Sequence, residues 1–357
     1  MKKLPLHDLH SESGAEFIES SGWLLPKKYD SVKQEYKSAK NGIAVIDFSS
    51  RGKIRLSGKE CFKFMQGMLS NDVIKLQSGK GVYATLLNVK GKMVADLYLY
   101  KDGDGAFLDL EQGLNKTISD LLLKYRLSYK AKIEDVTDKF IQLCYIGPKS
   151  TQFLSKLLNE DLSKLGDPSF IKKNIDDFEV FIVKVRRSSQ QGFDLYFPID
   201  CQESVKKFLV KESGGLKPNF IGLDTYEVLR VEAGIAKYGV DMNDSTIPIE
   251  AGLWDALNFE KGCYIGQEVI ARIKWRGRVN RHLVGIELEG EITADPQDKI
   301  LIDEKEIGFV TSSVYSYKSN KIICMAYIRR EFKDPGTGVK VLVDNQKIDG
   351  KVFNFNN

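Results

Sequence analysis

The sequence is poor in histidine, and this shortage excludes several classes of enzyme and metal protein. Only three histidines occur in 357 residues, so a metal site built from several histidines is almost excluded. A Ser-His-Asp or Cys-His hydrolase would have to rely on His282, which we expect to be a surface residue at a strand start. His7 and His10 stand in a polar N-terminal stretch that we expect to be a tail.

The cysteines are few and dispersed. Five occur, which is an odd number, and no two of them form a C-x-x-C pair. This spacing argues against a disulfide framework, a structural zinc site and a cluster held by a full set of protein ligands, so no metal ligand is predicted. We expect a reducing compartment, the cytoplasm. The five are Cys61, Cys144, Cys201, Cys263 and Cys324.

Long apolar runs and a strong charge imbalance are also missing. No stretch approaches 18 consecutive apolar residues, and no apolar run follows the lysines of the N-terminus, so we expect neither a membrane span nor a secretory signal. The net charge of +4 is mild for this length and does not describe a dedicated nucleic-acid binder. A monomer is the default expectation for the oligomeric state.

Local patterns predict an α+β protein of more than one domain, because the chain is too long for a single core. Ser31 is a plausible helix N-cap and Gly42 a plausible stop. The turns at Lys90-Gly91 and at residues 102–105 predict β-hairpins. The predicted parts are residues 1–50 with 141–255, residues 51–140, a connection over 256–279, and an all-β barrel or sandwich over 280–357.

The stretch KGCYIGQE, residues 261–268, holds the first candidate for chemistry. A thiol becomes reactive when a cation or a helix N-terminus stabilises its thiolate. Lys261 lies two positions before Cys263, and a helix could begin near Gly266. Both a cation and a helix N-terminus could therefore stabilise the thiolate of Cys263. The alternative is that Cys263 is one more small buried side chain.

A basic run follows, in which Arg272, Lys274, Arg276 and Arg278 are spaced by two. In a strand these side chains would line one face and suit a polyanion, such as a poly-carboxylate tail, a phosphate or a nucleic acid. The alternative, a solvated strand edge protected by charge, is the more frequent outcome for an isolated run.

Two further candidates are weaker. Tyr83, Asp96 and Tyr100 lie on the two arms of the predicted hairpin at Lys90-Gly91. Asp96 stands in an otherwise apolar run, and it either turns outward or serves a ligand amine. Arg230 falls at helical spacing with Tyr226, Leu229 and Ala233, and by itself this stretch indicates a helix and loop with structural charges.

Taken together, these stretches resemble one protein family. KGCYIGQE at 261–268 matches the K-G-C-Y-x-G-Q-E pattern of the YgfZ branch of the glycine-cleavage T-protein (aminomethyltransferase) superfamily. LSNDV at 69–73, LLNVKGKMVADLYLY at 86–100, LRVEAGIAKYGVDM at 229–242 and IGFVTSS at 307–313 agree in order, so the resemblance covers nearly the whole chain.

The resemblance implies a three-domain, ring-like fold with a C-terminal β-barrel and a tetrahydrofolate, or another folate form, in a central opening. Asp96 matches an aspartate that acts near the reactive folate nitrogen in the T-protein. The implied catalytic residues are Cys263 and Asp96. The implied folate-binding residues are Tyr83, Asp96, Tyr100, Gln190, Arg230, Lys261, Gln267 and Arg272.

Three departures separate this chain from the T-protein pattern. Gln190 stands where the family has a pterin-anchoring glutamate, and an amide offers one acceptor oxygen where a carboxylate offers two. Ala95 replaces a second acid, and Tyr226 replaces an arginine. The added cysteine motif belongs to the YgfZ branch.

The resemblance therefore implies a folate-binding accessory protein in the assembly or repair of iron–sulfur enzymes, including tRNA-modifying ones, with iron–sulfur client or scaffold proteins as partners. Its alternative is an enzyme, a tetrahydrofolate-dependent aminomethyl or one-carbon transferase. A polyglutamate tail of the folate is the implied partner of the basic run. RNA binding by residues 272–281 ranks last because the net charge is modest.

Overall fold

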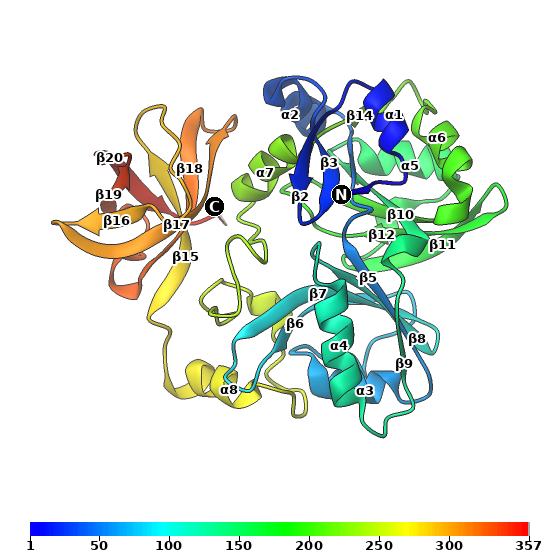
Figure 1. The fold of residues 1–357 in the computed structure, drawn as a ribbon, viewed down its shortest axis with the longest axis horizontal. Helices are drawn as coiled ribbons and strands as arrows, with labels where there is room; N and C mark the ends of the chain where they lie inside the picture. The colour runs from blue at the N-terminus through cyan, green and yellow to red at the C-terminus, as the bar shows by residue number, and fades with distance from the viewer. Residues whose placement is uncertain (356–357) are drawn as a thin grey trace. The chain divides into compact units, whose positions relative to one another are not determined.

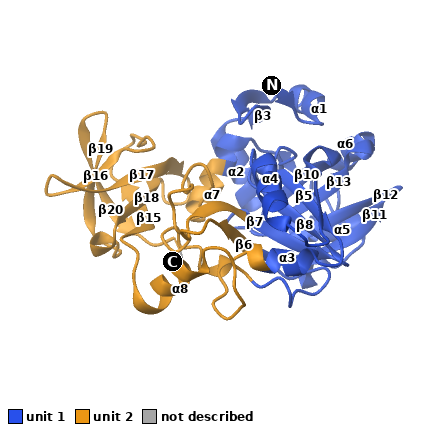
Figure 2. Cartoon of the chain, turned by 60° about the horizontal axis from the view of Figure 1, so that its bottom comes forward, with its two compact units in different colours: residues 1–66, 72–83, 97–226 blue, residues 67–71, 84–96, 227–357 orange. Residues whose placement is uncertain are grey.

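The computed structural model describes residues 1–355 and divides the chain into two compact units, each made of several segments (Figures 1 and 2). Unit 1 comprises residues 1–66, 72–83 and 97–226, and unit 2 comprises residues 67–71, 84–96 and 227–357. Within the described part of the chain, no helix is long and apolar enough to cross a membrane. The four-part division expected from the sequence stays a prediction.

The N-terminal stretch of unit 1 is a small sheet and not a tail. Strand β3 (Trp23–Lys28) pairs with β1 (Lys2–Lys3) and β2 (Glu16–Ser20), and helix α1 (His7–Glu12) joins them. His10 is fully buried, with Nε2 2.9 Å from Asp47 Oδ2 and Nδ1 2.8 Å from the Tyr29 hydroxyl. The expectation of a polar tail was wrong because these two partners satisfy the imidazole inside the unit.

Helix α2 (Val32–Asn41) follows the predicted bounds. The Ser31 side chain accepts a hydrogen bond from the backbone N–H of Gln34, and the helix ends at Gly42. Near its start, buried Glu35 accepts bonds from the backbone N–H groups of Tyr29, Asp30 and Gly222 and from the Thr225 hydroxyl.

A six-stranded sheet carries one apolar core of unit 1. The strand order is β11 (Ser169–Ile175), β12 (Phe178–Lys184), β13 (Gly192–Pro198), β10 (Phe140–Ile146), β4 (Ala44–Asp47) and β14 (Asn219–Phe220). Helices α5 (Ser150–Leu158) and α6 (Gln202–Leu209) contribute to its apolar cluster, which includes Phe153, Phe208 and Phe197. Strand β10 is buried along its whole length, as its near-continuous apolar sequence requires.

A five-stranded sheet carries the predicted hairpins. Its order is β6 (Gly81–Leu87), β7 (Met93–Asp102), β8 (Gly105–Leu110), β5 (Gly52–Ser57) and β9 (Lys132–Asp135). Both predicted turns are confirmed, and Gly91 and Gly103 adopt positive φ angles of 70° and 58°. Along the chain, helix α3 (Cys61–Met68) lies between β5 and β6, and helix α4 (Asn115–Arg126) lies between β8 and β9.

The C-terminal part of unit 2 is a closed six-stranded barrel, so the barrel alternative is confirmed over the sandwich. Its order is β15 (Arg281–Leu288), β18 (Lys321–Arg329), β17 (Lys305–Ser316), β16 (Lys299–Ile302), β19 (Gly338–Val343) and β20 (Gln346–Phe353). Alternate strand residues such as Ile286, Ile300 and Val341 fill its interior. The α+β class with a C-terminal barrel is therefore the observed fold.

Two helices and five short 3-10 helices complete the described chain. The helices are α7 (Leu223–Glu232) and α8 (Gln267–Arg276), and the 3-10 helices are η1 (Thr137–Lys139), η2 (Leu162–Lys164), η3 (Ile199–Cys201), η4 (Trp254–Ala256) and η5 (Arg330–Phe332).

Candidate functional site

The KGCYIGQE segment is anchored in unit 2 by its lysine. Lys261 is only 7% exposed, and its ammonium donates to the carbonyl oxygens of Leu69, at 2.5 Å, and Asn71, at 3.0 Å. The same ammonium lies 5.0 Å from the ring centroid of Tyr264. These contacts hold the segment against the loop after α3, and they give Lys261 a positioning role within the motif.

Gly266 must be glycine because of two separate constraints. Its φ angle is +84°, which favours glycine. A Cβ there would lie 2.6 Å from the backbone oxygen of Asn88 in the β6–β7 turn. On the other side of the same contact, a Cβ on Gly91 would lie 2.7 Å from Cβ of Val269. The start of α8 therefore packs directly on the hairpin turn of unit 2.

Cys263 is exposed, whereas the other four cysteines are buried. Burial raises the thiol pKa of all four buried residues, to about 11 for Cys201 and to about 12 for Cys324. Cys263 lies four residues before the first residue of α8, in a loop. It is thus the one cysteine of the chain whose thiol a partner molecule can reach without a change of structure.

The expectation of a basic strand over 272–278 was wrong, because these residues belong mostly to helix α8. Spacing by two places successive side chains about 200° apart around a helix, so they do not share one face. Arg272 pairs with Glu268 one turn earlier at 2.8 Å. The apolar residues Val269, Ile270 and Ile273 fall at helical spacing, and Ile270 is fully buried. The single strand face on which these four cations would have bound a polyglutamate tail is therefore absent.

Strand β7 carries the predicted aspartate. Buried and half-buried residues alternate along it, so Asp96 and Tyr98 project from the same face of the strand, and both are half-buried. In unit 2, Asp96 is close enough to Tyr238 to help raise the pKa of that phenol, after burial and Asp244. Gln267, the first residue of α8, is also half-buried.

Three tyrosines of unit 1 form a continuous set of rings. The Tyr83 and Tyr98 ring centroids are 5.0 Å apart, and those of Tyr98 and Tyr100 are 6.2 Å apart. Tyr83 and Tyr98 are half-buried, whereas Tyr100 is 1% exposed. The Tyr100 hydroxyl has no hydrogen-bond partner among residues 1–355, and burial raises the pKa of this phenol well above its ordinary value.

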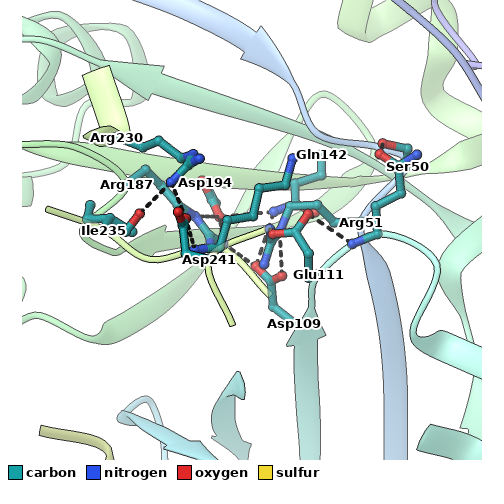
Figure 3. Close-up of polar contacts among 12 residues, drawn as sticks. Ser50, Arg51, Asp109, Glu111, Gln142, Arg187, Asp194, Arg230, Ile235 and Asp241 are labelled. Carbon is teal, nitrogen blue, oxygen red and sulfur yellow. Dashed lines mark hydrogen bonds and ion pairs between the residues drawn. The ribbon is translucent and has the colours of Figure 1, made fainter. Parts of the chain in front are cut away.

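Unit 1 also contains a buried network of charged side chains (Figure 3). Arg187, in the loop after β12, contacts Asp109 of β8 and donates to Asp194 of β13 at 2.5 Å. Arg51 donates to Oδ1 of Asp109 at 2.8 Å. The Tyr196 hydroxyl donates at 2.7 Å to Oδ2 of Asp109, the same oxygen that Arg187 contacts. Burial would raise the pKa of Asp109, but the two guanidinium groups outweigh it and hold that pKa below its usual range.

The network reaches the tyrosine rings through Arg187, whose guanidinium lies 5.4 Å from the ring centroid of Tyr98. Sequence reasoning missed both Arg187 and Tyr98. The sequence does show an acid inside each of two apolar strands, Asp109 in GAFLDL and Asp194 in GFDLYFP, and such buried acids indicate a cation nearby. Gln190 lies three residues after Arg187 in the same loop and is half-buried, with its backbone N–H donating to the Ser188 hydroxyl.

Arg230 serves a second buried network, in unit 2 (Figure 3). It is 1% exposed and donates to Asp241 at 2.7 Å, to the Ser312 hydroxyl at 2.7 Å and to the Ile235 carbonyl at 3.0 Å, and it also pairs with Glu227. These contacts tie α7 to the barrel strand β17 within the unit, which favours a structural role for Arg230.

The residues present suit a flat polar heterocycle better than a metal ion. Within residues 1–355, no group of three or more His, Cys, Asp or Glu side chains could hold a metal ion. The half-buried rings of Tyr83 and Tyr98 and the unsatisfied Tyr100 hydroxyl offer stacking and hydrogen bonding.

The close packing of Gly266 predicts that Gly266→Ala destabilises the protein. The left-handed backbone and the overlap with the Asn88 oxygen should lower the free energy of unfolding by about 2 kcal/mol. Gly262→Ala in the same motif is the matched control, because Gly262 is exposed and a Cβ there meets no atom within 4 Å. Equal thermal unfolding midpoints for the two variants would show that the contact is unimportant.

Lys53 of β5 predicts a pH dependence of stability. It is fully buried, and burial lowers its pKa from 10.5 to about 7, although Asp109 opposes this shift. Between these pH values the unfolded chain binds the proton and the folded chain does not, so stability should rise with pH, by up to about 1.4 kcal/mol per pH unit.

Urea unfolding from pH 7 to 9.5 checks this: the wild type should gain stability relative to Lys53→Met as the pH rises. Exposed Lys59→Met is the control and should parallel the wild type. Parallel pH curves for the wild type and Lys53→Met would contradict the account.

Comparison with known proteins agrees with this architecture. Residues 6–261 match the GCVT N-terminal domain, and residues 281–355 match the glycine cleavage T-protein C-terminal barrel domain. A crystal structure of glycine cleavage system aminomethyltransferase T from Bartonella henselae has a TM-score of 0.90 at 24% identity, over 98% of this chain and 96% of that chain. At this identity the likeness concerns the fold.

Two sequence relatives cover essentially the whole chain. A protein named aminomethyltransferase from Caldanaerobacter subterraneus subsp. tengcongensis is 30% identical over 361 residues, covering 100% of this chain and 96% of the relative. Another of that name from Oceanobacillus iheyensis is 31% identical over 361 residues, covering 98% and 96%. The chain therefore belongs to the glycine cleavage T-protein family of aminomethyltransferase-like proteins.

Proposed function

We propose that the protein is a tetrahydrofolate-dependent aminomethyl or one-carbon transferase of the T-protein type. The observation that carries this proposal is Asp96, a half-buried carboxylate on the same face of β7 as Tyr98. The relatives named aminomethyltransferase, which match the chain over its whole length, support it. This ranks the transferase above the iron–sulfur accessory role that the cysteine motif alone favours.

The folate would lie against this face of β7. Tyr83 and Tyr98 would contact the pterin, and Gln190 would take the place of the family's anchoring glutamate. Tyr100 would offer its buried hydroxyl as a hydrogen-bonding group. Tetrahydrofolate supplies a reactive amine nitrogen that accepts a one-carbon unit. Asp96 would hold or accept the proton at that nitrogen, the task of a general base within hydrogen-bond reach.

The departures from the family pattern would alter binding more than chemistry. Gln190 can accept one bond and donate others, so it would hold the pterin less strongly than a carboxylate. Lys261 and Arg230 would support the site indirectly, since their charged groups are bonded within unit 2. Gln267 and Arg272 stay proposed folate contacts.

Asp96→Asn tests the transferase proposal. Loss of the carboxylate should lower the transfer rate from an amine donor to tetrahydrofolate by about 10²–10⁴-fold, while folate affinity changes little. Asp102→Asn, the same change at the far end of the same strand, is the control and should keep its activity. An Asp96→Asn variant as active as the wild type, or a wild type with no transferase activity, would refute the proposal.

A second candidate is the role of the YgfZ branch, a folate-binding accessory protein for iron–sulfur enzymes. The exposed thiol of Cys263 favours it, because the other four cysteines are buried. One cysteine cannot hold a cluster alone, so an iron–sulfur client or scaffold protein, or a small thiol, would complete the site. Thiol exchange is the other reaction open to an exposed cysteine.

Cys263→Ser separates the two candidates. In a host that lacks its own copy of such a protein, the accessory role predicts that the variant fails to restore iron–sulfur enzyme activity, whereas Gly262→Ala restores it. The transferase role predicts that Cys263→Ser keeps its transfer rate within about twofold, since the thiol takes no part in the proton transfer. Full restoration by Cys263→Ser would remove the accessory role.

A further inference from the structure

Unit 1 contains a cavity beside helix α2 that none of the residues assigned to folate lines (Figure 1). Its walls are the turn at residues 29–30, one side of α2 and the two residues of β14, Asn219–Phe220. Its volume is about 570 Å³, and small-molecule sites span roughly 300–1,000 Å³. We call it the α2 cavity.

Two stacked rings form an apolar part of the wall. The ring centroids of Tyr29 and Phe220 are 5.2 Å apart with 17° between the ring planes, and both residues are half-buried. The Tyr29 hydroxyl is bonded to Nδ1 of the buried His10, so the hydroxyl is engaged and Tyr29 offers its ring. The rings therefore form a fixed surface for an apolar or aromatic group of a ligand.

Two opposite charges line the same cavity without neutralising each other. Asp30 and Lys37 are both exposed, and within residues 1–355 neither forms an ion pair. One Asp30 oxygen accepts a hydrogen bond from the backbone N–H of Ser31, which leaves the other oxygen open. The third charged residue, Glu35, is buried and already accepts four hydrogen bonds inside the unit. The α2 cavity thus offers one anion and one cation to a ligand.

Three amide side chains complete the polar wall. Gln34, Asn41 and Asn219 are exposed, and their amides have no hydrogen-bond partner in the described part of the chain. An amide both donates and accepts, so the same wall can bond an ammonium and a carboxylate.

We propose that the α2 cavity binds a free amino acid, in its zwitterionic form, that carries an apolar or aromatic side chain. The ligand's carboxylate would pair with Lys37 and its ammonium with Asp30, while its side chain would pack on Tyr29 and Phe220. This inference does not rest on the proposed transferase function.

Other classes of small molecule use this wall less completely. A nucleotide or another polyanion would meet a single cation, Lys37, and would be opposed by the charges of Asp30 and Glu35. A neutral sugar could use the three amides but would leave both Asp30 and Lys37 without a partner. A dipolar ligand with an apolar group accounts for the charges, the amides and the rings together.

The test is calorimetric titration of the whole chain with L-phenylalanine at about 0.15 M salt, with no folate present. Binding should be saturable, with a Kd below about 1 mM. Glycine, which has the same charges and no ring, should bind at least about tenfold more weakly. Lys37→Gln and Asp30→Asn should each weaken phenylalanine binding at least about threefold, and the new Asn side chain can still accept the bond from Ser31.

Two analogues of phenylalanine assign each charge to its partner. Phenethylamine lacks the carboxylate, so it should bind the wild type and Lys37→Gln equally, and hydrocinnamate lacks the ammonium, so it should bind the wild type and Asp30→Asn equally. Lys33→Gln removes an exposed cation of the same helix outside the cavity, and it should bind phenylalanine as the wild type does.

Three results would overturn the proposal: no saturable binding of phenylalanine, binding of either analogue as tight as that of phenylalanine, or equal losses in Lys37→Gln and Lys33→Gln. Because folate is absent, none of these results bears on the transferase.

Discussion

The candidate site depends on one buried interaction, the guanidinium of Arg187 held between Asp109 and Asp194. The two carboxylates come from strands β8 and β13, and Arg187 comes from the loop between β12 and β13. Removing any one partner would leave an uncompensated charge in the interior, which costs several kcal/mol. The network therefore fixes the 185–191 loop, and with it Gln190 and the guanidinium that faces Tyr98.

The cysteine motif is understood differently once its neighbours are known. Lys261 and Gly266 position the segment, the first through two carbonyl oxygens and the second through close packing on the β6–β7 turn. Cys263 is left exposed between these two anchors. The motif thus presents a thiol on a fixed support, and its lysine is occupied elsewhere.

Much of the fold could be predicted because its determinants are local. Ser31 and Gly42 bound a helix, and the turn glycines Gly91 and Gly103 mark hairpins, because capping and positive φ act within a few residues. The basic run was wrongly predicted to be a strand because only the spacing of its charges was considered. The apolar residues at helical spacing, such as the buried Ile270, indicate a helix. Near the end of α8 the local pattern alone admits both structures.

The charge networks could not be predicted, because they join residues far apart in sequence. Asp109 and Arg187 are separated by 78 positions, and His10 and Asp47 by 37. The strands give only half of each pair: an acid in an apolar run requires a buried cation but does not say which one. Asp96 was singled out as an acid in an apolar run, and the family resemblance then gave it a role; its strand face follows from the alternation of β7.

The central claim is that a folate binds the face of β7 that carries Asp96 and Tyr98. Hydrogen–deuterium exchange with and without tetrahydrofolate tests it most directly. The account predicts slower exchange in the segments around residues 83, 96–100 and 187–191, with the barrel strands unchanged. Protection confined to other segments, or no protection at saturating tetrahydrofolate, would contradict it.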